Sequence, residues 1–517
     1  MSQDLAAAPG DPTTQSGSLK RGALGLSGAV IMSAALMGPA VSVYFNPQLV
    51  AAQAGAATPF VFALSMVASL IVANGIMQMA RELPSAGAFY TYVARGIGAR
   101  TAFVTGGLMF VAYALLVPAE LALIGSYTHD LLAQHGVQIP WVIISLVAGA
   151  LMTLLAVRGI SGSIRVALVM FSCEVAVILV ISVIVLAKGG AHGLTAAPFN
   201  PSESPKGLSG IALGMVYGVL SFVGFEAAAT LGEETRDPKR NVPRGLVYSL
   251  LLVGAIYVFC TYAETIGFGT DSTGIGKLAA DAAPFTTLGQ TYAPWMNLLI
   301  SLAGISSIFA VTVNSNNGIV RILFAMGREG MLPRRFGTVH PRLGTPAFAV
   351  LAQSGFALVV TVIVGFWVGP FNAYAYLGAV LTFGIIPVYW LTNIACMRFF
   401  RKYRPDQFNV LRHVVLPVLG ILLMVIPIYG SVWPVPAAPY NWFPYAVLAY
   451  AIVMALIATV LGRRRPEFLA RAGGVLAGVE SDAEAAGMDE VSDTVAVPGS
   501  RADAADPADP AAAPEPA

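Results

Sequence analysis

The sequence contains few charged residues. Charged side chains make up 11% of its 517 residues, whereas hydrophobic ones make up 56%, and the mean hydropathy is +0.74. A chain of this composition has too little polar surface to cover several water-soluble domains. We therefore expect a lipid bilayer to be its main solvent.

Cysteine and histidine are also scarce. The three cysteines, Cys173, Cys260 and Cys396, each fall inside an apolar stretch and form no CxxC pair, so a disulfide framework is not indicated. The five histidines are scattered without the spacing of a ligand set, which argues against a metal site. We find neither a nucleotide-binding loop nor a nucleophile elbow. These shortages predict a protein that is not an enzyme and needs no cofactor.

Long apolar stretches dominate what is present. A membrane-spanning helix needs roughly 20 mostly apolar residues, and twelve stretches meet that requirement. We therefore predict an all-α integral membrane protein with twelve transmembrane helices. The predicted spans are residues 23–47, 56–79, 101–132, 139–158, 164–187, 209–232, 245–269, 294–325, 346–367, 372–397, 412–433 and 442–462.

The positive charges alternate with these spans. If the amino terminus is cytoplasmic, all but three of the 29 Lys and Arg residues fall on the cytoplasmic side, the exceptions being Lys188, Lys206 and Lys277. An excess of Lys and Arg on the inside sets membrane orientation. We expect a multi-pass protein of the cell membrane with both termini cytoplasmic. The basic loops are interpreted as juxtamembrane anchors rather than as nucleic-acid sites.

The two ends of the chain differ from the rest in composition. Residues 1–19 are rich in Ser, Thr, Gly, Pro and Ala, and residues 463–517 are rich in Ala, Pro, Asp and Glu. Neither segment holds enough apolar side chains to offset the entropy of ordering. We predict disordered cytoplasmic tails at 1–19 and 463–517, with a twelve-helix domain at 20–462 between them.

Two spans are interrupted halfway through the bilayer. The first contains Gly38-Pro39, and proline removes a helix donor and clashes with the preceding turn. The sixth contains Gly224, closely followed by Glu226. Backbone groups freed by such breaks are tolerated in a membrane only where protein buries them or they line a wet cavity. Either each break is an ordinary packing kink, or the pair forms a binding site at the midplane of an inverted-repeat transporter.

Three loop sequences carry a family resemblance. They are GFEAAATLGEETRDPKRNVPRG (224–245), ELPSAGAFYTYVARGIG (82–98) and RILFAMGREGMLPRRFGTVHPRLGTP (321–346). Together with the twelve-span layout, they resemble the amino acid, polyamine and organocation permeases. That resemblance implies two inverted five-helix repeats, two additional helices and transport by alternating access.

The predicted substrate site lies at the two breaks. Many members of the resembled family have Gly-x-Gly in the first break, where this chain has Gly38-Pro39-Ala40. Because Pro39 has no N–H, one donor for a substrate carboxylate is missing, which raises the prospect of an amine as substrate. The predicted substrate-binding residues are Met37, Gly38, Pro39, Ala40, Val41, Phe222, Val223, Gly224, Phe225 and Glu226.

Four carboxylates fall inside the predicted spans, and an ionisable group at that depth is costly unless it has a function. Glu226 either carries a proton or contacts a substrate ammonium, or is a carboxylate that neighbouring backbone amides cap and that does not change state. Glu174 either binds a proton, or binds Na⁺ together with hydroxyls such as those of Thr312 and Ser315, or has a structural role. Glu120 attracts cations from the outside or reaches the interface. The fourth, Glu264, is interpreted as interfacial.

These features predict a secondary transporter that imports an amino acid by proton symport with alternating access. An importer or exchanger of a small organic amine, such as putrescine, is the alternative. A channel or a membrane receptor is disfavoured, since neither requires two opposed broken helices. The expected partners are a small-molecule substrate, a coupling proton and the lipid bilayer.

Overall fold

The computed structural model describes residues 25–84, 88–159, 164–230, 235–328 and 332–464. Within these ranges the chain forms helices and connecting turns without any β-strand, in agreement with the predicted all-α class. The predicted tails, 1–19 and 463–517, lie outside the described residues except for Arg463 and Arg464.

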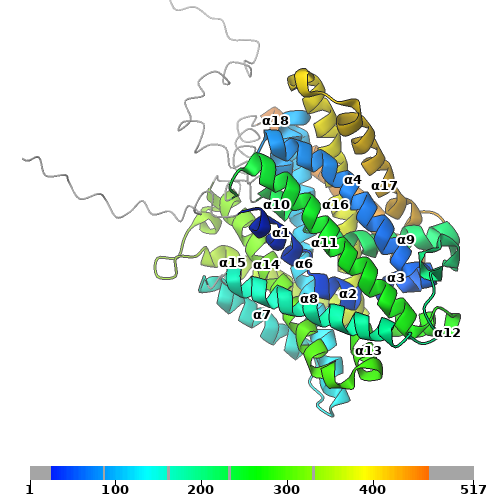
Figure 1. The fold of residues 1–517 in the computed structure, drawn as a ribbon. Helices are drawn as coiled ribbons and strands as arrows, with labels where there is room; N and C mark the ends of the chain where they lie inside the picture. Colours follow the sequence, from blue (N-terminus) through cyan, green and yellow to red (C-terminus); the bar gives the residue numbers. More distant parts are fainter. Residues whose placement is uncertain (1–24, 85–87, 160–163, 231–234, 329–331, 465–517) are drawn as a thin grey trace, which may run out of the picture. The chain divides into compact units, whose positions relative to one another are not determined.

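Each of the twelve predicted spans contains at least one helix (Figure 1). Among the described residues, eleven helical segments are long and apolar enough to cross a membrane, and α7 is apolar but shorter, with 17 residues. In chain order, the helices of the predicted spans are α1 (Leu26–Leu36) with α2 (Pro39–Phe45), α4 (Thr58–Glu82), α6 (Ala99–Gln134), α7 (Trp141–Val157), α8 (Ile164–Ala187), α9 (Gly207–Phe222) with α10 (Ala227–Thr230), α11 (Pro238–Phe268), α14 (Asn297–Arg328), α15 (Ala347–Val368), α16 (Pro370–Tyr403), α17 (Leu416–Gly430) and α18 (Phe443–Arg464).

Shorter helices connect some of these spans. They are α3 (Pro47–Ala54), α5 (Ala88–Gly96), α12 (Ser272–Ala280) and α13 (Pro284–Tyr292). A π-helical turn at Leu411–Val415 precedes α17. The inverted arrangement of two five-helix repeats remains a prediction.

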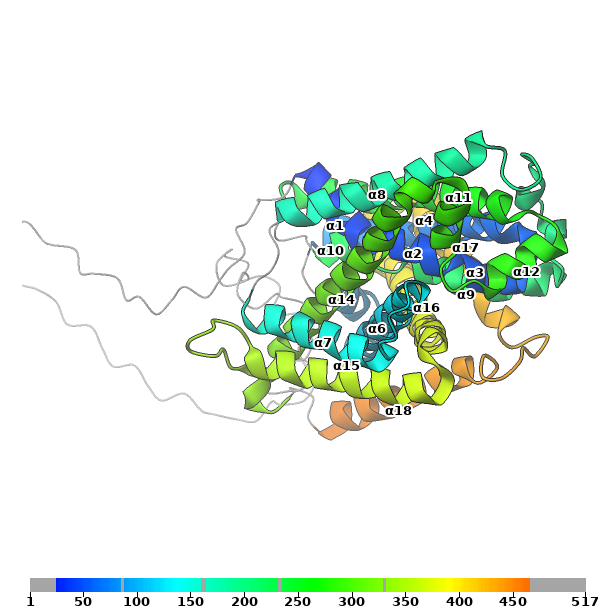
Figure 2. The same ribbon diagram turned by 90° about the horizontal axis from the view of Figure 1, so that it is seen from below.

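The helices differ strongly in how much of their surface is covered by protein. In the apolar part of Gly207–Ala229, which contains α9, 89% of the residues are buried, whereas in α18 only 6% are buried. Helix α6 packs against both α16 and α14, and α4 packs against α11 (Figure 2). Because the apolar side chains of α18 face outward, we assign that helix to the lipid boundary and α9 to the protein interior.

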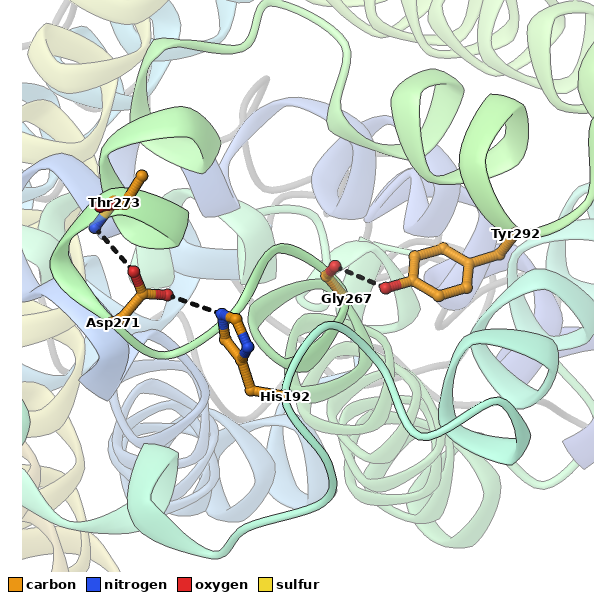
Figure 3. A network of polar contacts seen from close by, with 5 residues as sticks. All are labelled: His192, Gly267, Asp271, Thr273 and Tyr292. Carbon is orange, nitrogen blue, oxygen red and sulfur yellow. Dashed lines mark hydrogen bonds and ion pairs between the residues drawn. The ribbon is translucent and has the colours of Figure 1, made fainter.

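At one end of the helices, the loop after α8 is fixed to the loop after α11 (Figure 3). His192 Nε2 lies 3.3 Å from Asp271 Oδ1, and Asp271 Oδ2 accepts a hydrogen bond of 3.2 Å from the N–H of Thr273 at the start of α12. Tyr292 donates to the carbonyl of Gly267 at 2.9 Å. Although slight desolvation opposes it, the hydrogen bonds from backbone N–H groups lower the pKa of Asp271. Asp271 therefore acts as the N-cap of α12.

At the ends of α4 and α16, a different ion pair forms. The side chain of Arg404 lies 3.0 Å from a carboxylate oxygen of Glu82. In the loops near Asp271, by contrast, the ammonium of Lys188 donates to the carbonyl of Tyr292, and Lys206 donates to Gln53. Two of the three Lys residues predicted to lie outside thus hold connecting segments in place.

Candidate functional site

The first predicted break is a real interruption of the helix. Helix α1 ends at Leu36, Gly38 adopts a left-handed conformation with φ 56°, and α2 begins at Pro39. A residue with a side chain is strained in that conformation, and a Cβ on Gly38 would lie 2.7 Å from a methyl group of Val311. Proline is well suited to the first position of a new helix because its missing N–H is not needed there.

The second predicted break is also present. Helix α9 ends at Phe222, Val223 is extended, and Gly224 has φ 108° before α10 begins at Ala227. The N–H of Gly224 donates to the side chain of Glu226 at 3.1 Å. The carboxylate of Glu226 thus satisfies one of the backbone donors that the break releases.

The two breaks touch each other, although 186 positions separate Gly38 from Gly224 in the chain. A Cβ on Gly224 would lie 2.9 Å from the carbonyl oxygen of Leu36. Ser33 in α1 donates its hydroxyl to the carbonyl of Phe225 at 3.1 Å and accepts from the N–H of Ala228 at 2.8 Å. One hydroxyl of the first span therefore satisfies two backbone groups in the second break. In Figure 1, α1 and α10 lie next to each other beside α11.

Tyr257 in α11 joins the same two segments from the opposite side. Its hydroxyl lies 3.0 Å from the carbonyl oxygen of Met37 and 2.8 Å from that of Ser221. Both carbonyls belong to helix ends that lack the usual intrahelical partner. The unwound backbone is thus held by protein side chains, as a membrane environment requires.

A small cavity lies at this junction. Its wall is mostly apolar, with a few polar groups from α2, α6 and α16. The lining residues are Leu36, Met37, Gly38, Val41, Ser42, Asn46, Leu116, Ala119, Glu120, Leu220, Val223, Val311, Tyr374 and Gly378. A small pocket of this kind, apolar with few convergent polar groups, is typical of small-molecule sites.

The structure divides the predicted substrate-binding residues into two groups. Four of them line the cavity, namely Met37, Gly38, Val41 and Val223. The other six do not belong to its lining: Pro39, Ala40, Phe222, Gly224, Phe225 and Glu226. Their part in binding therefore remains a prediction.

Phe222 and Phe225 pack into the protein core rather than over the cavity. The ring of Phe222 lies 5.1 Å from that of Tyr257, and the ring of Phe225 lies 5.7 Å from that of Tyr389. Both side chains are only 1% exposed. Both rings, which the sequence predicted to bind substrate, are packed in the core of the protein.

Some cavity residues were not identified from the sequence. Leu116 and Tyr374 come from α6 and α16, two helices that stay continuous through an internal proline. Tyr374 donates to Asn46, and Asn46 donates to Ser221, at 2.8 and 2.7 Å. Only the packing of α6 and α16 against the broken helices brings these residues to the cavity.

Glu226 is held by three donors. Tyr113 in α6 donates to its Oε1 atom, and Tyr389 in α16 donates to its Oε2 atom at 3.2 Å, beside the N–H of Gly224. The side chain is 1% exposed. Glu226 therefore connects the break of the sixth span to two further helices instead of facing the cavity.

Glu174 lies between α8 and α14. It accepts a hydrogen bond of 2.8 Å from Ser306, and the neighbouring Ser307 accepts from the N–H of Val41 at 3.3 Å. The structure thus pairs Glu174 with Ser306 instead of Thr312 or Ser315, the hydroxyls suggested by the sequence. The hydroxyl of Thr312 donates to the carbonyl of Ile308 at 2.7 Å.

The two remaining carboxylates are buried without saturating their hydrogen bonds. Glu120 is 3% exposed and lines the cavity. Glu264 is 0% exposed, and neither of its oxygens has a hydrogen-bond partner among the described residues. The sequence interpretation of Glu264 as interfacial was wrong, since α11 packs this side chain inside the protein.

The backbone donors near Pro39 are largely occupied. The N–H of Gly38 donates to the carbonyl of Ala35 at 3.2 Å, and the N–H of Val41 donates to Ser307. Pro39 has no N–H to offer. Of the three N–H groups near the first break, those of Gly38 and Val41 have protein acceptors, and that of Ala40 is left for a substrate carboxylate.

Comparison with known proteins adds independent information. A family model described as amino acid permease matches residues 29–466. A branched-chain amino acid permease of Bacillus subtilis is 26% identical over 87% of this chain and 95% of its own length. A second such permease, from Lactococcus lactis, is 25% identical over 79% of this chain and 90% of its own. A low-affinity putrescine importer of Escherichia coli is 25% identical over 80% of this chain and 88% of its own.

Proposed function

We propose, from the premise that the chain belongs to the amino acid permease family, that this protein imports an amino acid by proton symport with alternating access. The sequence resemblance to that superfamily is confirmed. The chain is a multi-pass membrane protein that transports amino acids or amines, and its relatives are transporters rather than enzymes. Proton coupling, alternating access and the direction of transport are the proposed part.

The observation that carries this proposal is the contact between the two broken helices. Gly224 lies so close to the end of α1 that any side chain larger than hydrogen would clash with the carbonyl oxygen of Leu36. The hydroxyl of Ser33 forms hydrogen bonds with Phe225 and Ala228 in the second break. Discontinuous helices that meet near the bilayer midplane form the binding site in many secondary transporters. The cavity beside the junction supports binding of a small substrate there.

Glu226 is the proposed carrier of the coupled proton. A carboxylate accepts from Tyr113, Tyr389 and Gly224 at once, whereas a protonated carboxyl must donate one of its own bonds. Protonation would therefore change how the sixth span is bound to α6 and α16. We propose that this change biases the equilibrium between outward-open and inward-open states.

Glu174 and Glu120 are the other proposed coupling residues. Glu174 joins α8 to α14 through Ser306 and is able to hold a proton or contribute to an ion site between these helices. Glu120 reaches the cavity itself, so it meets whatever cation enters. A cation that binds at either position would be transported or released together with the cargo.

A specific observation supports an amine as the alternative cargo. The N–H groups of Gly38 and Val41 already have acceptors, and Pro39 has none to give. Carboxylate recognition at the first break would need such donors. A putrescine importer among the relatives is consistent with this alternative.

The experiment is uptake into liposomes that contain the purified full-length protein. We expect saturable accumulation of an amino acid or an amine that depends on an imposed pH gradient, whereas a channel would only equilibrate its permeant. Screening amino acids beside their decarboxylated amines identifies the cargo. A protein that shows no saturable uptake of either class would contradict the proposed function.

Glu226→Gln tests the coupling step. The amide remains able to accept a hydrogen bond but cannot release a proton, so accumulation driven by the pH gradient should be lost while exchange of cargo across the membrane continues. Glu264→Gln is a matched control, because Glu264 is equally buried but lies outside the cavity. Full accumulation by Glu226→Gln would remove Glu226 from the proton pathway.

A further inference from the structure

The cavity at the helix breaks contains one carboxylate in its wall. That residue is Glu120 on α6, a helix that lies between α16 and α14 (Figure 2). Glu226, the acidic residue next to the second break, is held by Tyr113 and Tyr389 and does not line the cavity. The negative charge that a bound molecule meets therefore comes from the third predicted span, not from the sixth.

In the part of the chain that the structure describes, no protein group neutralises Glu120. Its side chain is 3% exposed, and its Oε2 atom is buried without a hydrogen-bond partner among the described residues. No Lys, Arg or His is found in the lining of the cavity. A buried carboxylate is unfavourable unless it is paired or protonated. Glu120 is therefore either protonated or available to pair with a cation that enters the cavity.

The rest of the wall determines what kind of molecule can supply that pairing. Leu116 precedes Glu120 by one helical turn, and Leu220, Val223 and Val311 face the same space from α9, the second break and α14. These side chains offer apolar surface to an alkyl chain but few hydrogen bonds. A hydrated inorganic cation would find only a few oxygen ligands in this wall to replace its water.

We propose that Glu120 binds an ammonium group of the cargo while the apolar wall contacts an aliphatic chain attached to that ammonium. The inference rests on the proposed transport function and adds to it the residue that binds the ammonium of the cargo. Such an ammonium is either the α-ammonium of an amino acid or the terminal ammonium of an amine or a basic side chain. The first source requires an amino acid as cargo, whereas the second requires an amine or a basic side chain. An experiment can therefore separate them.

The test compares four probes of similar length on the purified full-length protein in lipid nanodiscs, with calorimetry as the readout. Norleucine has only an α-ammonium, cadaverine has only terminal ammonium groups, lysine has both kinds, and hexanoate has none. The wild-type protein should bind at least one ammonium-bearing probe and should not bind hexanoate. In Glu120→Gln, the affinity for the probe held at Glu120 should fall by about 10- to 100-fold, the usual effect of losing a charged partner.

The pattern of losses identifies the source of the ammonium. If the α-ammonium binds at Glu120, then norleucine and lysine both weaken. If a terminal ammonium binds there, cadaverine and lysine weaken whereas norleucine does not. Glu120→Asp keeps the charge but withdraws it by one methylene, so the same probes should weaken by a smaller factor. This second variant also provides the test if Glu120→Gln does not fold.

Glu264→Gln is the matched control, since it removes a buried carboxylate that does not line the cavity, and it should bind every probe like the wild type. Unchanged affinities in Glu120→Asp and in any folded Glu120→Gln, beside normal wild-type binding, would overturn the inference and leave the transport function intact. Equal wild-type affinity for hexanoate and the ammonium probes would overturn it as well. A wild-type protein that neither binds nor transports any amino acid or amine would instead contradict the proposed function.

Discussion

Ser33 shows how much one side chain contributes to this site. Its hydroxyl accepts from the N–H of Ala228 and donates to the carbonyl of Phe225. Both backbone groups lie in the second break, where no helix satisfies them. A serine in an apolar helix is normally able to bond within its own helix, so the sequence gives no sign that Ser33 bonds to a segment almost 200 residues away.

We predict that Ser33→Ala lowers the stability of the protein and its rate of uptake. The substitution leaves two buried backbone groups unpaired, each costing about 1 to 3 kcal/mol. Thermal unfolding in detergent measures the first effect and liposome uptake the second. Ser182→Ala is the control, because Ser182 is equally buried but donates to Ile178 in its own helix. Equal melting temperatures for the two variants would contradict the assigned role of Ser33.

The buried carboxylates also differ at the residue scale. Glu226 has three donors, Glu174 accepts from Ser306, Glu120 faces the cavity, and Glu264 is enclosed without a partner among the described residues. All are the same residue type in apolar spans. Sequence reasoning identified them as unusual but could not separate their environments, because each environment is formed by other helices.

At the scale of elements, the two breaks depend on glycine. Gly224 has φ 108°, a conformation that L-residues rarely adopt, and the carbonyl of Leu36 occupies the place of its missing side chain. Gly38 has φ 56° and faces Val311. Each break is thus fixed both by its own backbone conformation and by a neighbouring helix.

We predict that Gly224→Ala abolishes uptake and reduces the yield of folded protein. The added methyl group would lie 2.9 Å from a backbone oxygen, which cannot move without shifting α1, and the strained φ adds roughly 1 to 3 kcal/mol. Uptake and size-exclusion chromatography measure the two effects. Gly318→Ala is the matched control: Gly318 lies within α14, and nothing approaches its Cβ position within 4 Å. Uptake by Gly224→Ala at the wild-type rate would show that the breaks need not touch.

At the scale of the whole molecule, the distribution of Lys and Arg predicts its orientation. The loop that contains His192 and the segment that contains Asp406 belong to opposite sides in that scheme. Each segment has an exposed residue that can be replaced by cysteine. Leu194 is 60% exposed, and Asp406 is also exposed. Both are suitable for labelling.

We predict that a membrane-impermeant maleimide labels Leu194→Cys in intact cells but labels Asp406→Cys only after the membrane is permeabilised. The excess of positive charge near Asp406 should hold that side in the cytoplasm. The three native cysteines, Cys173, Cys260 and Cys396, are first replaced by alanine. Labelling of Asp406→Cys in intact cells would reverse the proposed topology.

The sequence by itself determined the membrane class, the approximate positions of the spans and the places where two helices break. These properties depend on local physics: apolar runs of sufficient length partition into lipid, and a Gly-Pro step in the middle of a span opposes a continuous helix. The family resemblance, now confirmed, followed from short loop motifs that are equally local.

Only the tertiary structure decided which side chains surround the cavity. It placed Glu120 in the wall, held Glu226 behind it with Tyr113 and Tyr389, and buried Phe222 and Phe225 in the core. The reason is geometric, since the face that a long apolar helix turns toward its neighbours is set by packing with those neighbours. In a helix that is apolar on all sides, the sequence pattern does not indicate which face packs against the neighbouring helices.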